Sequence, residues 1–528
     1  MRSSGSLNSM TFLPIRRHLL LLPLISLCLC SPKPRERSLT LLGINDIYRI
    51  EGVAGGKAGG LARVRALRQR LEKNSGPVLV FHAGDALMPA AMSQAFQGGQ
   101  MIDILNRLDG DGNAFDENMW MTFGNHEFDI KEAEALDARI EESQFVWLSG
   151  NIRFAEGPDG TPLIEAPNLQ PMALVERSGI ALGILSLVID VKTQSYIRTF
   201  DDVTATAERM TAELRNRGAE VVIGLTHLEA VDDVALLEKL GDRGPDLIIG
   251  GHDHQHLALP GNGRWVLKAD ADAKTATVVT LTLGPKGLSV THRWEPLDEA
   301  HVAPDPEVSS AVLDWFRKYD PDGKLTVPVG KTRVRLDAEE TTIRRFETAL
   351  GNWVADQMLD SMADHGAQIA FINSGTLRLN DIIFAGDPIT KGHVNELLPY
   401  PQDLVVLPIT GAMLDEILQH SVSNWNASGH FLQIAGFRFV HDTEAGHAGS
   451  IEMPDGDGWR RVAPEERILA VTSTFLAGGG DGYELLADTD PIARNGDLKD
   501  LLLRRLAAAG EEGIAPQVEG RIRLKPGN

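Results

Sequence analysis

The chain has 528 residues, which is too long for one hydrophobic core and predicts two domains with linkers. Its hydrophobic share of 43% and charged share of 23% are those of an ordinary soluble protein. The formal net charge of −22 argues against a nucleic-acid-binding surface or a basic face drawn to a bilayer, so an anionic substrate needs local arginine or metal charge.

The first 37 residues have the features of an export signal. A basic stretch at residues 16–18 precedes an apolar run at 19–30, which has the length of a signal-peptide core and is too short to span a membrane. Cys28 and Cys30 lie at positions −3 and −1 of a possible cleavage before Ser31. We therefore expect a periplasmic or extracellular protein, with cleavage as the first interpretation and a membrane anchor as the second. Since both cysteines lie here, a metal in the mature chain would need His, Asp, Asn or Tyr ligands.

From residue 39 to about residue 283, short apolar runs alternate with amphipathic stretches, which is typical of a layered α/β domain. Buried strands are expected at residues 39–44, 78–81, 119–123, 145–148, 180–188, 221–225 and 247–249. Helices are expected at residues 61–71 and 203–215.

A stretch rich in proline and acidic residues follows and predicts a connector with one helix over residues 308–318. Beyond it we expect helices at 346–362 and 413–421 and strands at 368–372, 404–409 and 468–472. The predicted division is a targeting segment (1–37), a first α/β domain (38–295), a linker (296–326) and a second α/β or α+β domain (327–528).

Five of the expected strands in the first domain end in residues that bind metals. These residues are Asp46, Asp85, Asn125 with His126, His227, and His252 with His254. Because the carboxyl ends of parallel strands in one sheet meet on one rim, we expect their oxygen and nitrogen atoms to converge. Two divalent ions need six or more ligands, one of them bridging, and the Asp85 carboxylate is the natural bridge. A single histidine at a strand end is more often structural, and residues 252–256 alone could be a surface metal clip, but the four upstream strand ends weigh against both.

The stretch from Gly124 to Asp129 adds a pair that can handle protons. The Asp129 carboxylate can fix the tautomer of the His126 imidazole and raise its pKa, while Asn125 offers a neutral oxygen to a metal. Alone, such a turn also occurs by chance, so its interpretation depends on the other strand ends.

The order of these motifs resembles the calcineurin-type metallophosphoesterases, and with the second domain it resembles the secreted 5'-nucleotidase and UDP-sugar hydrolase family over residues 39–524. The resemblance implies a layered αββα-type metallophosphoesterase domain followed by a substrate-binding domain. It implies two divalent ions (Zn, Mn or Co), one bound by Asp46, Asp85 and His254 and the other by Asp85, Asn125, His227 and His252. It also implies a catalytic pair, His126 with Asp129, that stabilises the transferring phosphoryl group or protonates the leaving oxygen.

Tyr48 departs from the family pattern, which has Asp-x-His where this chain has Asp46-Ile47-Tyr48. A phenol ionises near pH 10 and binds zinc poorly unless it is deprotonated. Three interpretations stay open. Tyr48 points away and leaves a weaker first site; or it binds as a phenolate, which favours iron, as in the related purple acid phosphatases; or the site is disabled.

Residues of the second domain have the chemistry to read a substrate. Gly375 permits a tight turn, and Arg378 can make bidentate contacts with phosphate, although a lone arginine is more often merely exposed. The resemblance implies that Asn373 and Arg378 read the phosphate and ribose side. By the same resemblance, Tyr400 and Phe475 sandwich the base and Asp481 binds sugar hydroxyls, with Arg345 as the nearest candidate for a further family arginine.

The expected function is metal-dependent hydrolysis of phosphate monoesters, above all nucleoside 5'-phosphates, to nucleoside and phosphate, with domain closure as part of turnover. The alternatives within enzymes are a 2',3'-cyclic nucleotide, a UDP-sugar or a sugar phosphate as substrate. The non-enzyme alternative is an exported nucleotide-binding protein with a degraded metal site. A small phosphoester is the expected partner, and neither a nucleic acid polymer nor a stable protein partner is expected.

Overall fold

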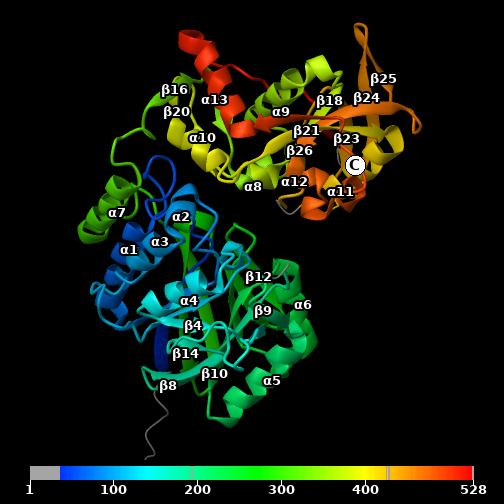
Figure 1. The fold of residues 1–528 in the computed structure, drawn as a ribbon. Helices are drawn as coiled ribbons and strands as arrows, with labels where there is room; N and C mark the ends of the chain where they lie inside the picture. Colours follow the sequence, from blue (N-terminus) through cyan, green and yellow to red (C-terminus); the bar gives the residue numbers. More distant parts are fainter. Residues whose placement is uncertain (1–35, 192–193, 424, 426–427, 526–528) are drawn as a thin grey trace, which may run out of the picture.

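The computed structural model describes residues 36–191, 194–423, 425 and 428–525, and the chain forms two α/β domains joined by a connector (Figure 1). The expected targeting segment, with Cys28 and Cys30, lies outside the described residues apart from its last two positions. Among the helices of the described ranges, none has both the length and the apolar character needed to cross a bilayer.

Two sheets face each other in the first domain. The larger sheet contains, in spatial order, β15 (Gly287–Pro296), β14 (Thr275–Gly284), β1 (Arg37–Ile44), β2 (Val78–His82), β3 (Met119–Thr122), β4 (Val146–Leu148) and β6 (Leu169–Gln170). The smaller sheet contains β12 (Leu257–Gly261), β13 (Arg264–Lys268), β11 (Leu247–Gly250), β10 (Val221–His227), β8 (Ile180–Val188) and β7 (Met172–Arg177). The expectation that all the ligand-bearing strands belong to one sheet is wrong, because β1, β2 and β3 lie in one sheet and β10 and β11 in the other.

Buried apolar side chains separate this domain into layers. Leu41, Phe81 and Trp120 pack against Ile223 and Ile249 between the two sheets. On the outer face of the larger sheet lie α1 (Leu61–Ser75), α3 (Gly99–Leu105) and α4 (Ala133–Glu142), and the smaller sheet is covered by α5 (Val203–Asn216) and α6 (Ala230–Leu240). The expected αββα layering is confirmed.

The connector helix is α7 (Pro306–Tyr319), which covers the residues expected from the sequence. It begins at an Asp305 cap whose carboxylate accepts from two backbone N–H groups. Val308 and Val312 join the outer core of the first domain, and Trp315 donates to Asp103 at 2.7 Å. The helix therefore packs on the first domain before the chain crosses to the second.

The second domain is built on a mixed sheet with the order β22 (Leu432–Ala435), β18 (Ile369–Asn373), β26 (Arg467–Ser473), β21 (Asp403–Thr410) and β27 (Ala493–Asp497). One face packs against α9 (Ala349–Ser361), α10 (Lys391–Leu397) and α13 (Leu498–Ala509), and the other against α11 (Gly411–Val422). A smaller sheet contains, in spatial order, β25 (Gly458–Arg461), β24 (His447–Asp455), β23 (Arg438–Asp442) and β28 (Ile522–Leu524). The helix expected from residue 346 starts at Ala349, because the Thr348 hydroxyl caps it by accepting from Gly351 N at 3.0 Å.

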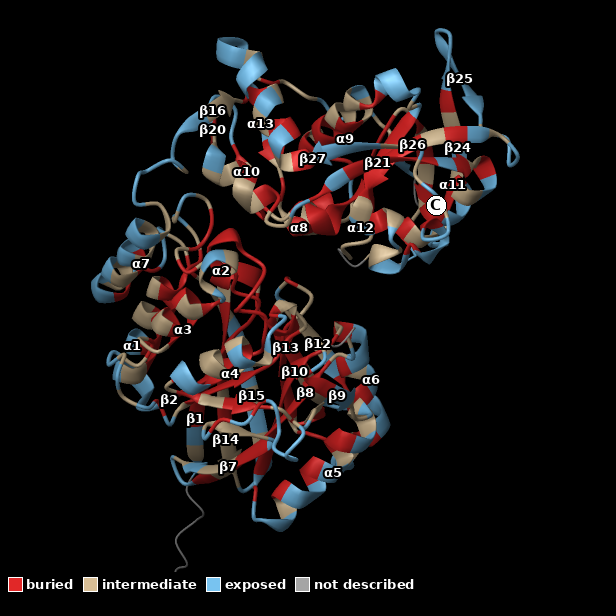
Figure 2. Ribbon diagram, in the orientation of Figure 1, coloured by how far each residue is buried: buried red, intermediate tan, exposed pale blue. Residues whose placement is uncertain are grey.

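Loops at one end of the first domain face the second domain (Figure 1). Figure 2 shows that buried residues fill the strands and continue into these loops, beneath the short helix α8 (Glu340–Ile343) of the second domain. The candidate ligands Asp85, Asn125, His252 and His254 lie at this junction.

Candidate metal centre and substrate cavity

The loops after the strands hold several candidate ligands in an unusual backbone conformation. The φ angles are 51° at Asp46, 58° at Asp85, 82° at His252 and 59° at His254. Positive φ is uncommon for residues other than glycine and persists only where the surroundings enforce it, and such residues cluster at functional sites. Four of the sequence-predicted ligands share this feature, which supports a common site.

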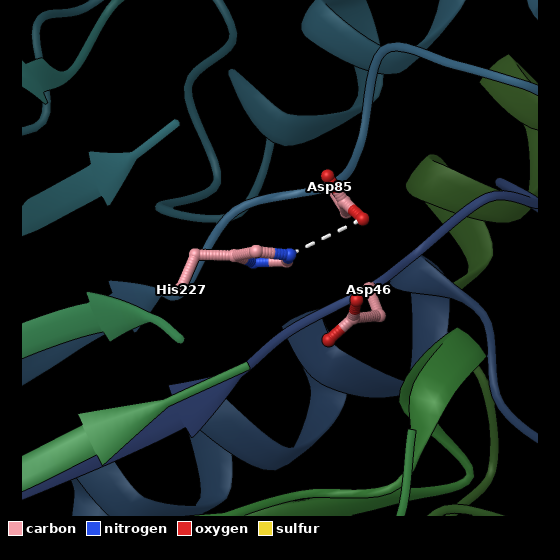
Figure 3. A group of neighbouring side chains, drawn as sticks. All are labelled: Asp46, Asp85 and His227. Carbon is pink, nitrogen blue, oxygen red and sulfur yellow. Dashed lines mark ion pairs between the residues drawn. The ribbon is translucent and has the colours of Figure 1, made fainter. Parts of the chain in front are cut away.

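Asp46, Asp85 and His227 form the centre of the group, with ligand atoms all within 4.8 Å of one another (Figure 3). The Nε2 atom of His227 lies 3.3 Å from Oδ2 of Asp85. Its Nδ1 lies 2.7 Å from the carbonyl of Ala83 and donates to it, which turns Nε2 toward the carboxylates. A histidine fixed in this way by a backbone carbonyl is pre-oriented as a metal ligand.

The remaining predicted ligands extend this centre on two sides. On one side, Oδ1 of Asn125 lies 3.2 Å from both His227 Nε2 and His252 Nδ1. On the other side, His254 Nε2 lies 3.2 Å from Oδ1 of Asp46. The carboxylate of Asp85 lies between the two sides, so the structure brings all the predicted ligands together.

The charges of this group depend on one another. Burial alone would raise the pKa of Asp85, but His227 and His126 hold it far below its usual value. Burial alone would lower the pKa of His227, but Asp85 raises it to about 9. The pKa of His254, which burial would also lower, is raised to about 10 by Glu340 and Asp46. Carboxylate, amide and imidazole donors suit a divalent cation, which would compete with protons for these imidazoles.

Tyr48 points into this centre. Its hydroxyl lies 2.9 Å from Nε2 of His254, 3.2 Å from Oδ2 of Asp85 and 3.3 Å from Oδ1 of Asp46. The interpretation that Tyr48 points away is therefore wrong, and the phenol stands where a ligand would. Burial and the negative charges of Asp85 and Asp46 raise the pKa of Tyr48 well above its usual value, so without a bound cation the hydroxyl is neutral.

Glycines let the loops approach the ligands. A Cβ on Gly124 would lie 2.2 Å from Oδ1 of Asp85 and 2.7 Å from Cε1 of His227. A Cβ on Gly251 would lie 3.0 Å from both Oδ2 of Asp46 and Nδ1 of His227. The glycines that precede Asn125 and His252 in the motifs are therefore required by the packing of the ligands.

Glu127 has a positioning role that the sequence interpretation missed. Its fully buried carboxylate accepts from the N–H groups of Asp85 (2.9 Å), Ala86 (2.7 Å), Leu87 (3.1 Å) and Gly124 (2.6 Å). These contacts tie the loop after β2 to the loop after β3. The signal was present as the acidic residue beside His126 in the motif.

The second domain contacts both members of the predicted catalytic pair. Nδ1 of His126 lies 2.7 Å from Oδ2 of Asp129, and its Nε2 accepts from Nη1 of Arg378 at 3.3 Å. The Tyr400 hydroxyl donates to the same Oδ2 of Asp129 at 2.9 Å. Burial alone would raise the pKa of Asp129, but His126, Arg378 and Tyr400 hold it below its usual value.

A cavity of about 310 Å³ lies between the domains over the metal centre. Its walls include Asp85, Asn125, His126, His252 and His254 from the first domain and Glu340, Arg344, Gly375, Arg378 and Asp481 from the second. Asn373 donates to Asp481 at 2.6 Å, which fixes that carboxylate at the wall.

Four predicted substrate residues are not part of this wall, namely Arg345, Asn373, Tyr400 and Phe475, although Asn373 reaches it through its bond to Asp481. Arg344 lines the cavity, whereas Arg345, the candidate chosen from the sequence, does not. Neither Tyr400 nor Phe475 is among the cavity-lining residues. Phe475 is 43% exposed and packs beside Gly480, while the hydroxyl of Tyr400 is bonded to Asp129.

The fold and the grouped ligands are those of a calcineurin-like phosphoesterase, and the family models agree. The calcineurin-like phosphoesterase model matches residues 39–256, and the model of the 5'-nucleotidase C-terminal domain matches residues 328–488. The chain therefore combines a calcineurin-like phosphoesterase domain with a 5'-nucleotidase C-terminal domain.

Individual relatives show the same architecture. The chain is 23% identical to 5'-nucleotidase of Bos taurus, over 94% of this chain and 92% of that protein. It is 27% identical to the trifunctional nucleotide phosphoesterase protein YfkN of Bacillus subtilis (strain 168), over 93% of this chain, and it spans 35% of that protein's length. The crystal structure of a 5'-nucleotidase precursor from Thermus thermophilus superposes with a TM-score of 0.79 at 25% identity, covering 93% of this chain and 100% of that one.

Proposed function

We propose that this protein hydrolyses nucleoside 5'-phosphates to nucleoside and phosphate in a reaction that depends on two bound metal ions. The observation that carries the proposal is the shared cavity, in which Asp85 and His126 of the first domain face Arg378 and Asp481 of the second. The relatives with nucleotidase activity in their names, which match over nearly the whole of this chain, support the same substrate class.

The grouped donors suit two ions with one shared ligand. Asp46, Asp85 and His254, with Tyr48, would hold one ion, and Asp85, Asn125, His227 and His252 would hold the other. Bound Zn²⁺, Mn²⁺ or Co²⁺ would polarise the phosphoryl group and lower the pKa of the attacking water. At the Tyr48 side, iron is a further candidate, because a trivalent ion can stabilise a phenolate.

The chain's own residues then bind and orient the ester. Arg378 and Arg344 supply positive charge for the phosphoryl oxygens, which the net charge of −22 makes necessary. His126 lines the cavity with its Nδ1 bonded to Asp129, and in its protonated form it stabilises the phosphoryl group or gives a proton to the leaving oxygen. Asp481, fixed by Asn373, accepts from sugar hydroxyls.

Phe475 would stack on the base, because its exposed ring packs beside Gly480, the neighbour of the cavity-lining Asp481. Tyr400 supplies a second aromatic ring. This ring lies next to Arg378, whose guanidinium carbon is 6.0 Å from the ring centre. Phe475→Ala should raise the KM for AMP and leave kcat close to wild type. An unchanged KM would refute the stacking role.

A panel of esters tests the substrate class against its rivals. AMP, UMP, a 2',3'-cyclic nucleotide, a UDP-sugar and a sugar phosphate should be assayed with added Mn²⁺, Zn²⁺, Co²⁺ or iron. The proposal requires the highest kcat/KM with a nucleoside 5'-phosphate. A cyclic nucleotide, UDP-sugar or sugar phosphate as the best substrate would replace it, and saturable binding without turnover would favour an exported nucleotide receptor.

The domain limits and the location also belong to this proposal. We assign residues 38–295 to the metallophosphoesterase domain, 296–326 to the linker and 327–528 to the substrate-binding domain, supported by the separate cores of the two parts.

The basic and apolar stretches before residue 31 support export, with removal of the signal or retention as a membrane tether.

A further inference from the structure

The second domain places a buried carboxylate against a ligand of the metal centre. Glu340 begins α8 and is 3% exposed. Its Oε2 is paired with Nδ1 of His254, and its Oε1 accepts from Nη2 of Arg344. His254 lies in the loop after β11 of the first domain, so this pair joins the two domains at the metal centre.

The two nitrogens of His254 face different partners. Nε2 faces the metal group, at 3.2 Å from Oδ1 of Asp46 and 2.9 Å from the Tyr48 hydroxyl. Nδ1 faces Glu340 alone among the described hydrogen-bond partners. Histidines that bind metals usually donate their second N–H to a carboxylate or carbonyl, which fixes the ring and makes the ligating nitrogen more basic. His227 receives this support from Ala83 in its own domain, whereas His254 receives it from the other domain.

Glu340 is itself held firmly in place. Its backbone N–H donates to Oδ1 of Asn380 at 3.1 Å, and Nδ2 of Asn380 donates to Asp272 of the first domain at 2.8 Å. A buried carboxylate is costly unless it is paired, and here His254 and Arg344 both pair with it. The Glu340 carboxylate is therefore a buried group with a fixed orientation, unlike one in a surface ion pair.

We propose that Glu340 is a positioning residue which the second domain supplies to the metal centre, so that the ion-binding site at His254 is complete only when the two domains are together. The inference rests on the proposed metal site and adds a coupling between ion binding and domain closure. By reciprocity, an ion bound at His254 favours the closed arrangement by the same factor by which closure favours the ion.

The same carboxylate connects the metal centre to the substrate cavity. Arg344, which pairs with Oε1 of Glu340, lines the cavity wall. Glu340 therefore pairs through one oxygen with the candidate metal ligand His254 and through the other with the cavity-lining Arg344. Losing its charge should weaken ion binding and also loosen Arg344.

Ion binding can be measured without turnover by Mn²⁺ titration of metal-free protein, with free Mn²⁺ counted by electron paramagnetic resonance. Glu339→Gln is the matched control, because Glu339 is the neighbouring residue and also crosses the domains, with Oε1 3.4 Å from Nζ of Lys274. Wild type and Glu339→Gln should bind two ions alike. Glu340→Gln should bind one ion normally and the other about 10- to 100-fold more weakly. Identical titrations of Glu340→Gln and wild type would overturn the proposal.

A second measurement needs no variant and therefore decides the matter even if Glu340→Gln folds poorly. Small-angle scattering of the wild-type full chain should show a smaller radius of gyration with saturating Mn²⁺ than without it. An unchanged radius would overturn the coupling to closure. If the wild type bound no Mn²⁺, the proposed metal site would fail as well, whereas normal binding by Glu340→Gln with active enzyme would remove only the role of Glu340.

Discussion

The hydroxyl of Tyr48 lies 2.9 Å from Nε2 of His254, inside the group of predicted metal ligands. A buried, neutral phenol is a poor ligand for zinc, and only a cation that displaces its proton would make it a good one. The departure from the family's Asp-x-His pattern therefore alters the chemistry of the centre instead of leaving a gap in it.

Iron loading should give Tyr48 a signature in the visible absorption spectrum. Protein reconstituted with Fe³⁺ should show a phenolate-to-iron charge-transfer band in the visible spectrum, which Tyr48→Phe abolishes. Tyr400→Phe is the control, because its hydroxyl is bonded to Asp129 rather than to the metal group, and it should keep the band. A colourless iron-loaded wild type would exclude phenolate ligation.

The hydroxyl of Tyr400 should act through Asp129. Because it donates to the same Oδ2 that holds His126, Tyr400→Phe should lower kcat for AMP about tenfold, in line with a hydrogen bond to a charged group. KM should stay near wild type, since the ring remains. The decrease in kcat should be smaller with p-nitrophenyl phosphate as substrate, because its leaving group needs no proton. An unchanged kcat in Tyr400→Phe would refute the role of the hydroxyl.

Binding of the ions should release protons. In the metal-free protein the pKa is about 9 for His227 and about 10 for His254, so both are protonated at pH 7.5 and must lose a proton to bind an ion. Affinity should therefore fall as the pH is lowered below these values. Calorimetric titration with Mn²⁺ in buffers of different ionisation enthalpy should show net proton release. Equal heats in all buffers would contradict the protonation of His227 and His254 in the metal-free protein.

Glu127 should be essential for the loop that carries Asp85. Glu127→Ala would leave four buried N–H groups without their acceptor, so the free energy of unfolding should fall by about 2–5 kcal/mol and Mn²⁺ binding should be lost. Urea denaturation and Mn²⁺ titration measure both effects. Glu117→Ala, whose side chain is 80% exposed, is the control and should behave as wild type. Normal ion binding by Glu127→Ala would refute the anchoring role.

Much of the first domain could be predicted from the sequence because its signals are local. Apolar runs such as that before Asp85 marked strands, and polar residues at their ends marked ligands. Apolar runs do not say which sheet a strand joins, so the ligands of β10 and β11 were assigned to the wrong sheet. The strands β12 to β15, which complete the two sheets, were not expected either.

The parts of the site that escaped prediction depend on contacts between distant segments. Glu340 meets His254 across 86 positions, and Tyr400 meets Asp129 across 271. The orientation of Tyr48 depends on three partners, two of which lie far along the chain. Arg344 and Arg345 are equivalent in sequence, and only the turn that α8 makes decides which of them reaches the cavity.

The most direct test is phosphate release from AMP by metal-free protein to which Mn²⁺, Zn²⁺, Co²⁺ or iron is returned, with metal content measured in the same samples. Wild type should be inactive without metal and should regain activity as two ions bind. Asp85→Ala should bind the ions poorly and should lose activity, because the Asp85 carboxylate lies between the two groups of ligands and contacts both. AMP binding without phosphate release under every metal, or full activity in Asp85→Ala, would contradict the account.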